Sequence, residues 1–498
     1  MCFGIAMAFF PIRPFWNDEW RLIYNIKFKS EHQLWGRLDL LQQCPRVFLI
    51  LLKKVTAFFD YSYISLRLPA LVITTASIPL CFYLRKKVFP NGSVYTYLFI
   101  LILISSQTFT DYIVQMKQYE MEIFLCLLTL WQLMTLLDIG VESRVNKLKY
   151  LLLCFTFLVA PFLSYTYPIA VAPLIPIVII SSVMHIRNRQ LKSNKLSYLL
   201  SLYLPLLLVC AAIVVFYIVD VKQLMVDNNM YQSYKKMLDN ERSSSNFIRD
   251  FWGLFSLVGS GALYEIIFGV LGITSFFYGM YRLIKNRTDV PTRQDYFKLY
   301  AIMLLLLTLA LFLSGKLLGE VARLTAFTVP SIAILIVSFF EDLGAKYNYQ
   351  KLANIITAVL FLGLFGNIIV TFIDRLSFPE YKNRIETYRH TAKALRQARL
   401  NKEPILITDG VRGDKINRDA SAPGKILSNT ITPQQIAGMD TLCTEVILKV
   451  NPEYKVWDTI PVYIIPDMKW TKEYMAQLPS DIKSATFCDG INFMRVYR

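Results

Sequence analysis

The sequence predicts an α-helical membrane protein that crosses the bilayer many times and carries a small α/β domain at its C-terminus. Of the 498 residues, 55% are apolar and only 18% are charged, whereas about 25% charged residues are usual in a soluble protein. The apolar residues gather in long runs, and the mean hydropathy is +0.41. The final part of the chain, after residue 374, is polar instead. This pattern excludes a soluble enzyme, a disordered chain and a fibrous repeat.

The apolar runs are long enough to be membrane spans, since a helix needs about 20 mostly apolar residues to cross a bilayer. The predicted spans are 63–84, 93–112, 119–138, 148–163, 166–184, 196–219, 253–281, 299–315, 324–340 and 352–373. The run 253–281 exceeds the length of one span, so we expect it to be tilted or broken near residues 259–261. Residues 1–13 are apolar but short, and we interpret them as the end of a first helix whose beginning is missing or misassigned. The total is then about eleven spans.

The basic residues predict the orientation of these spans. The chain has 53 Lys and Arg against 36 Asp and Glu, a net charge of +17. Cations gather in alternate short loops, which marks those loops as cytoplasmic: Arg85, Lys86, Lys87; Arg144, Lys147, Lys149; Arg187, Arg189, Lys192, Lys195; Arg282, Lys285, Arg287, Arg293, Lys298. The segments 14–62, 220–250 and 314–323, and everything after 374, are then external. We expect no nucleic-acid partner, because no basic helix or basic-aromatic motif stands outside these loops.

The pattern divides the chain into two predicted domains. Residues 1–374 form a transmembrane domain, whose first external loop, 14–62, contains amphipathic helices that lie along the membrane surface. Residues 375–498 form a soluble extracytoplasmic domain. Its expected elements are a helix at 379–400 and strands at 405–408, 445–450, 460–465 and 491–497, separated by turn-forming residues. Cys443 and Cys488 lie in this domain and would be able to pair in an external, oxidising compartment.

Two adjacent acids, Asp18 and Glu19, follow the first apolar segment and are flanked by Trp16 and Trp20. One interpretation is structural, because acids stabilise the N-terminus of a helix, here one lying at the membrane interface. The other is functional: paired carboxylates at a membrane surface are able to act as general bases.

Two further clusters of polar residues lie at external span ends. Asp111, Lys117 and Tyr119 belong to a turn so short that Lys117 is held at the membrane surface, although it would also be able to snorkel into water. The second cluster is Lys316, Glu320 and Arg323, directly before an apolar run. Charges there are costly unless paired or functional, and Glu320 and Arg323 have the spacing of a pair on one helix.

Several short motifs resemble the membrane glycosyltransferases of the GT-C superfamily. Asp18-Glu19 is followed by Cys44-Pro45-Arg46-Val47-Phe48 and by Ser65-Leu66-Arg67-Leu68-Pro69-Ala70, an order similar to that of protein O-mannosyltransferases and bacterial aminoarabinose lipid A transferases. Lys117-Gln118-Tyr119 resembles the segment that opens the family's fourth span, and the segment 323–330 resembles its late helix. The resemblance covers most of residues 1–340.

The resemblance implies a GT-C fold and a glycosyltransferase that moves a sugar from a polyprenyl-phosphate donor to a hydroxyl of a protein, lipid or glycan. It implies Asp18 as general base, with Glu19 orienting Asp18 or the acceptor. Lys117 and Arg323 would hold the lipid phosphate. Further candidates are Arg46, Lys53, Lys54 and Lys316 for the phosphate, and Asp111, Tyr119 and Glu320 for the cavity wall.

No cofactor is required for such a reaction, and a divalent metal stays open with no ligands assigned. The implied location is a bacterial inner membrane, with the active site and the C-terminal domain on the periplasmic side. Two alternatives remain: a transporter or flippase for lipid-linked glycans, and an O-antigen polymerase or ligase.

Overall fold

The structure is a computed structural model that forms two compact units, one made of residues 1–11 and 25–372 and the other of residues 12–24 and 373–498. The structure describes Glu19, 22–23, 25–26, 29–36, 38, 42–59, 63–89, 95–112, 115–141, 146–187, 195–222, 244–258, 262–285, 291–314, 316–317, 322–346, 350–377, 405–407, 462–465, 483–486 and 494–497. The predicted helix at 379–400, the strand at 445–450, the segment 1–13 and both Cys443 and Cys488 lie outside these residues.

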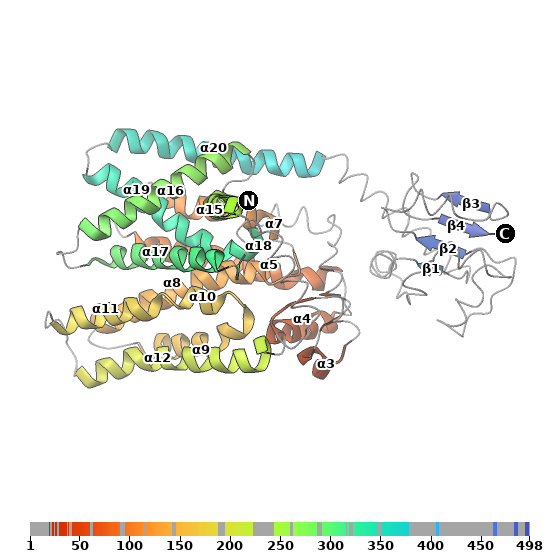
Figure 1. The fold of residues 1–498 in the computed structure, drawn as a ribbon, viewed down its shortest axis with the longest axis horizontal. Coiled ribbons are helices and arrows are strands. Elements are labelled where there is room, and N and C mark those ends of the chain that lie inside the picture. The colour runs from red at the N-terminus through yellow and green to blue at the C-terminus, as the bar shows by residue number, and fades with distance from the viewer. Residues whose placement is uncertain are drawn as a thin grey trace. The chain divides into compact units, whose positions relative to one another are not determined.

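The first unit is a bundle of helices (Figure 1). In chain order its helices are α3 (Glu31–Trp35), α4 (Arg46–Phe58), α5 (Tyr63–Val88), α6 (Thr96–Ser105), α7 (Gln107–Tyr112), α8 (Tyr119–Val141), α9 (Lys147–Val159), the 3-10 turn η1 (Ala160–Leu163), α10 (Tyr167–Val171), α11 (Leu174–Arg187), α12 (Lys195–Phe216), the π turn η2 (Tyr217–Val221), α15 (Ser244–Ser256), α16 (Ala262–Lys285), α17 (Arg293–Leu313), α18 (Ala322–Thr325), the 3-10 turn η3 (Ala326–Thr328), α19 (Val329–Lys346) and α20 (Gln350–Ser377).

Among the described residues, seven helical stretches are long and apolar enough to cross a membrane. They are Ser65–Val88, Tyr119–Ile139, Tyr167–Arg187, Leu196–Val221, Leu263–Lys285, Arg293–Leu313 and Ala326–Gly344, with shorter apolar helices at Thr96–Ser105 and Asn354–Gly366. Of the two alternatives for 253–281, a tilted or a broken helix, the structure has the broken one, because α15 ends at Ser256 and α16 begins at Ala262. The predicted span 148–163 is α9 followed by η1, where Pro161 accompanies the change to a 3-10 turn.

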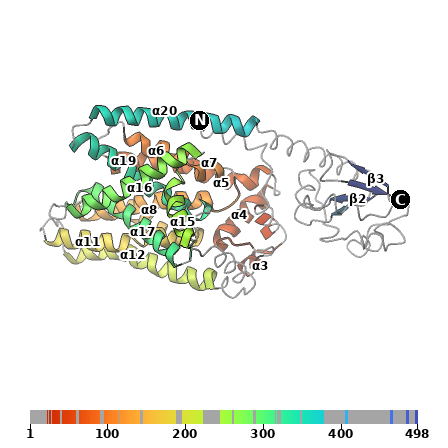
Figure 2. The same cartoon turned by 45° about the horizontal axis from the view of Figure 1, so that its top comes forward.

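Two of these helices form the centre of the bundle. The apolar window of α8 is 83% buried and that of α19 is 78% buried, against 33% for α12 and α16. In both views of the bundle α8 lies among the other helices (Figures 1 and 2). The outer helices expose large apolar side chains such as Leu148, Leu207 and Leu362. A surface of that kind is suited to contact with lipid chains, because its side chains are apolar and the polar groups of the helix backbone are hydrogen-bonded within the helix.

Close helix packing in the bundle depends on a glycine of α16. A Cβ atom added to Gly272 would lie 3.0 Å from Cδ1 and 3.3 Å from Cβ of Phe255, and 3.4 Å from Cγ2 of Ile332. Phe255 and Ile332 are fully buried on α15 and α19, so neither side chain has room to move away. Gly272 thus lets three helices approach closely, as small residues do in membrane bundles.

We expect Gly272→Ala to lower the free energy of unfolding by about 1–3 kcal/mol, the usual cost of overpacking a core. The matched control is Gly366→Ala on α20, where nothing lies within 4 Å of the added Cβ. That control should be neutral or slightly stabilising, because alanine has the higher helix propensity. Apparent melting temperatures of the detergent-solubilised proteins measure the difference, and equal melting temperatures would contradict the packing argument.

One end of the bundle carries paired charges. Asp138 at the end of α8 accepts from Lys149 at 2.8 Å and also from Arg293. Asp342 on α19 lies 3.3 Å from Arg282 and 3.4 Å from Lys298. The cations belong to segments that the sequence predicts to be cytoplasmic. Each carboxylate therefore joins its own helix to two others, and we call this region the basic end.

The second unit contains a four-stranded sheet of β1 (Ile405–Ile407), β2 (Val462–Ile465), β3 (Lys483–Thr486) and β4 (Met494–Tyr497) in the order β1-β2-β4-β3. β1 and β2 are parallel, with Leu406 opposite Ile464, whereas β4 is antiparallel to both β2 and β3. The predicted strands at 405–408, 460–465 and 491–497 are confirmed. β3 was not predicted, because its sequence Lys-Ser-Ala-Thr is short and mostly polar.

Candidate functional site

Buried polar side chains gather where the start of α8 meets α4, the turn after η1, and η2. Arg46, Lys117, Glu122, Thr166 and Asp220 are all at most 8% exposed. Together with Cys44 and Tyr165 we call them the polar cluster. Electrostatic interactions link its members: the charges of Lys117, Arg46, Asp220 and Glu122 all act on the Cys44 thiol, and Thr166 interacts with the Glu122 carboxyl. We take this cluster as the candidate site, because it brings together buried charged and polar side chains from segments that are distant in the sequence.

Asp220 ties three segments of the cluster together. The N-cap of α4 is Pro45, which has no side chain able to cap the helix. Asp220 replaces that cap: its Oδ2 accepts from the backbone N–H of Arg46 at 2.7 Å. Its Oδ1 accepts from the Tyr165 hydroxyl at 2.9 Å. The π turn η2, a type of turn frequent at functional sites, carries Asp220 at the end of α12.

We expect Asp220→Ala to lower the free energy of unfolding by about 2–4 kcal/mol, because it leaves the Arg46 N–H and the Tyr165 hydroxyl without their buried acceptor. Tyr165→Phe removes a single hydrogen bond and should cost about 1 kcal/mol. Thermal unfolding in detergent measures both. A larger loss for Tyr165→Phe than for Asp220→Ala would show that the cap on α4 contributes little.

Arg46 is the most completely buried cation of the cluster, with an exposed fraction of 1%. One terminal nitrogen of its guanidinium donates to the carbonyl oxygen of Cys44 at 3.2 Å. Its Nε has no hydrogen-bond partner among the described residues. A buried guanidinium with an unused donor is suited to bind an anion such as a phosphate oxygen.

Lys117 supplies a second cation to the same place. It lies in the turn between α7 and α8 and is only 8% exposed. Its ammonium nitrogen lies 5.9 Å from the ring centroid of Tyr119, and that ring packs against Tyr112 at 4.7 Å. A snorkelling lysine would keep its ammonium group in water, so the structure favours the interpretation in which Lys117 faces the protein interior.

Burial raises the pKa of the Cys44 thiol to about 12, although Lys117 and Arg46 oppose the shift while Asp220 and Glu122 add to it. The thiol is therefore protonated at neutral pH, which excludes a thiolate nucleophile. Two basic residues, Arg46 and Lys117, and two acidic residues, Asp220 and Glu122, therefore lie close enough to Cys44 to influence its thiol.

Two acids at the start of α8 have positions in the structure that the sequence did not predict, and neither was assigned a role. Glu120 is completely buried, and neither of its carboxylate oxygens has a hydrogen-bond partner among the described residues; the Thr74 hydroxyl is near but outside bonding geometry. Glu122 lies beside Thr166 and keeps one oxygen, Oε2, without a partner. Buried carboxylates with spare acceptors are rare. Their signal in the sequence was the Glu-x-Glu at the opening of an otherwise apolar span.

Arg67 was also missed as a site residue, although it lies in the Arg-Leu-Pro motif quoted for the resemblance. It is completely buried on α5, which packs along α8. Asp220 was missed because nothing local marks it, since its partner Arg46 lies 174 residues away.

The predicted site residues have different positions in the structure. Arg46, Lys117 and Tyr119 are buried at the start of α4 and α8. Lys53 donates to the backbone carbonyls of Ile26 and Lys29, at 2.5 Å and 2.8 Å, so it holds the preceding segment in place. Lys54 is 61% exposed and lies 3.5 Å from Glu31, away from the cluster. Lys316 is exposed as well.

The remaining predicted site residues are either buried or not fully described by the structure. Glu19 is buried, at 1% exposed, and belongs to the second compact unit. Asp111 and Arg323 lie in α7 and α18, but their side chains are outside what the structure describes. Asp18 and Glu320 lie outside the described residues. Within the described part of the chain, no three His, Cys, Asp or Glu side chains are placed to share a metal ion.

Sequence comparison gives no relative: no family model matches the chain, and no curated protein matches it. Its structure, however, is similar to that of ArnT from Cupriavidus metallidurans bound to undecaprenyl phosphate, with a TM-score of 0.56 over 99% of this chain and 96% of that one, at 11% identity. The apo state of the same protein gives a TM-score of 0.54 at 12% identity, with the same coverage.

This chain has the GT-C fold. The predicted fold class, an α-helical polytopic membrane protein of GT-C type, is thereby confirmed. At such low identity the similarity establishes the fold alone. The roles of individual residues are therefore argued from the geometry of the polar cluster.

Proposed function

We propose that this GT-C protein is a glycosyltransferase that takes a sugar from a polyprenyl-phosphate donor and transfers it to a hydroxyl group of a protein, lipid or glycan. The observation that carries the proposal is the pair of buried cations, Arg46 and Lys117, in the polar cluster of a GT-C fold. Transfer of the sugar leaves a lipid phosphate, whose developing charge needs cations held in place before the reaction.

Arg46 and Lys117 have complementary roles in this proposal. The guanidinium of Arg46 offers planar donors that match a phosphate, whereas the ammonium of Lys117 acts as a point charge. The similar ArnT structure binds undecaprenyl phosphate, a ligand of the class proposed here. Arg323 remains a further candidate for the phosphate.

The acceptor hydroxyl loses a proton as its oxygen bonds to the anomeric carbon of the sugar, and the bond from that carbon to the phosphate oxygen breaks. We propose Asp18 as the base that receives the proton, with Glu19 orienting Asp18 or the acceptor. Within the polar cluster, the carboxyl group of Glu122 is suited to hold an acceptor hydroxyl. The reaction needs no cofactor in this proposal, and a divalent metal would change only how the phosphate charge is neutralised.

The proposed setting is a bacterial inner membrane with the polar cluster on the periplasmic side. Two features support this side. The basic end lies in segments that the positive-inside rule assigns to the cytoplasm. Polyprenyl-phosphate sugars also serve as donors where nucleotide sugars are absent.

A donor-cleavage assay tests the proposal. The protein is reconstituted in vesicles that contain an isotope-labelled polyprenyl-phosphate sugar, and mass spectrometry follows both free polyprenyl phosphate and glycosylated acceptor in a membrane extract. We expect both products to form together and to be reduced together in Lys117→Met. Movement of the intact labelled donor across the bilayer without cleavage would instead support the transporter alternative.

A further inference from the structure

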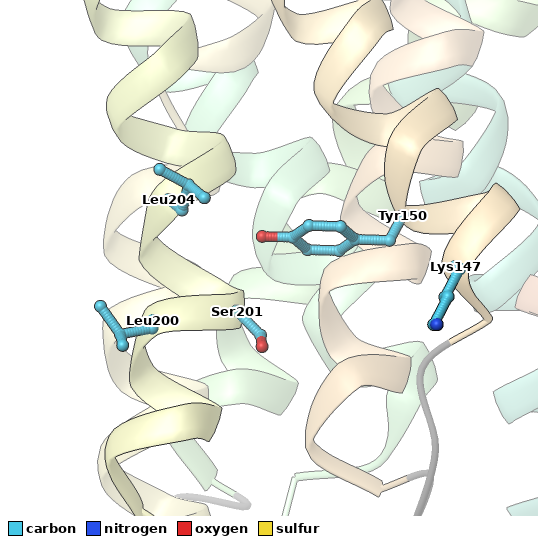
Figure 3. Close-up of a pocket in the computed structure, with 5 residues that line it drawn as sticks. All are labelled: Lys147, Tyr150, Leu200, Ser201 and Leu204. Carbon is cyan, nitrogen blue, oxygen red and sulfur yellow. The ribbon is translucent and has the colours of Figure 1, made fainter.

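A cavity of about 230 Å³ lies between α9 and α12, outside the polar cluster. Lys147 and Tyr150 of α9, and Leu200, Ser201 and Leu204 of α12, line it. In Figure 3 the Tyr150 ring extends from α9 toward α12, with Ser201 facing the same gap. Two hydroxyl groups and one ammonium group therefore border a small cavity whose other wall is leucine.

Lys147 differs from the paired cations of the basic end in having no acidic partner among the described residues. Lys149 and Arg293 are paired with Asp138, and Lys298 and Arg282 with Asp342. Within the described part of the chain, no carboxylate lies within ion-pair distance of Lys147. Lys147 also opens α9, so the positive end of the helix dipole adds to its charge. Among the described residues, the lining of the cavity is thus positive and contains no carboxylate.

The leucines of the cavity face outward, toward what surrounds the bundle. Leu200 is 61% exposed and Leu204 is 48% exposed. Exposed apolar side chains continue along both helices, with Leu148, Leu151 and Phe155 on α9 and Leu207 on α12. In a membrane protein such a surface contacts acyl chains. An occupant of the cavity would have an anionic head near Lys147 and a hydrocarbon tail along these leucines.

We propose that this cavity binds one anionic phospholipid of the membrane leaflet at the basic end. The Lys147 ammonium pairs with the lipid phosphate, the Tyr150 and Ser201 hydroxyls donate to its oxygens, and Leu200 and Leu204 contact the first part of an acyl chain. Anionic lipids are attracted to juxtamembrane cations. The hydroxyls and the shape of the cavity add selectivity that a lone surface lysine lacks.

The test uses the full chain in nanodiscs that contain phosphatidylglycerol and phosphatidylcholine in equal amounts. Native mass spectrometry after release from the nanodisc measures how much of each lipid stays bound. We expect phosphatidylglycerol to be retained preferentially by the wild type. The double variant Lys147→Gln/Tyr150→Phe should weaken this retention roughly tenfold, since it removes the cation and one hydroxyl donor that hold the lipid phosphate.

Two controls separate the cavity from general attraction to the basic end. Lys285→Gln removes another exposed cation, one that donates to Tyr281 at 3.0 Å, and it should leave retention unchanged. Ser201→Leu fills the cavity without removing charge and should lower retention as the double variant does. Added inorganic phosphate should not displace the lipid. Equal retention of the two lipids, displacement by phosphate, or equal losses in Lys285→Gln and the double variant would each overturn the proposal.

Discussion

Asp18→Asn is expected to lower kcat for sugar transfer by about 10²–10⁴-fold, the usual contribution of a general base. The amide keeps the size of the carboxylate but accepts no proton from the attacking hydroxyl. Binding of the polyprenyl-phosphate donor should change little, because the proposed phosphate ligands are Arg46 and Lys117. Single-turnover transfer from labelled donor measures the chemical step, and equilibrium binding of polyprenyl phosphate measures the donor site.

Glu19→Gln is the matched control for Asp18→Asn. The two acids are adjacent in the chain, so both variants remove one charge from the same segment. If Glu19 only orients Asp18 or the acceptor, its variant should lose less activity than Asp18→Asn and should raise KM for the acceptor. Full activity in a folded Asp18→Asn protein would remove Asp18 from the mechanism. A larger loss in Glu19→Gln would transfer the role of base to Glu19.

Local patterns in the sequence predicted much of the fold. Long apolar runs gave the spans, because a bilayer requires a certain length of apolar helix. The interruption of 253–281 was visible as two glycines within three residues, at 259 and 261. Three of the four described strands are rich in the β-branched and aromatic residues typical of strands, whereas β3 has only Thr486 of these.

The candidate site was only partly predictable, because it depends on contacts between residues that are far apart in the sequence. Lys117 stood out because its turn is short, and Arg46 because it belongs to a motif. The cap that Asp220 provides to α4 joins residues 174 apart, and no local periodicity reveals such a contact. Glu120 and Glu122 lie at the start of a span, where acids also occur as ordinary helix-stabilising residues. Only burial distinguishes them, and burial follows from how helices pack.

Lys117→Met is expected to weaken binding of the polyprenyl-phosphate donor about ten- to a hundredfold. The charge-assisted interaction with the phosphate contributes about 1.5–3 kcal/mol, and each 1.4 kcal/mol corresponds to a factor of ten. Methionine has a similar length and is apolar, so it fills the space of the buried lysine. The loss should appear in the KM for the donor, and also in kcat if the cation stabilises the leaving phosphate more strongly in the transition state.

Two control variants accompany Lys117→Met: one keeps the positive charge at residue 117, and the other removes a positive charge elsewhere. Lys117→Arg keeps the cation and should retain most of the donor affinity, whereas Lys54→Met removes an exposed cation that pairs with Glu31 and should have little effect. Because Lys117 is a buried cation of the polar cluster, its loss also changes the balance of charge around Cys44. Melting temperatures must therefore accompany the kinetics. Unchanged donor affinity in a stable Lys117→Met protein would mean that the phosphate binds elsewhere than the polar cluster.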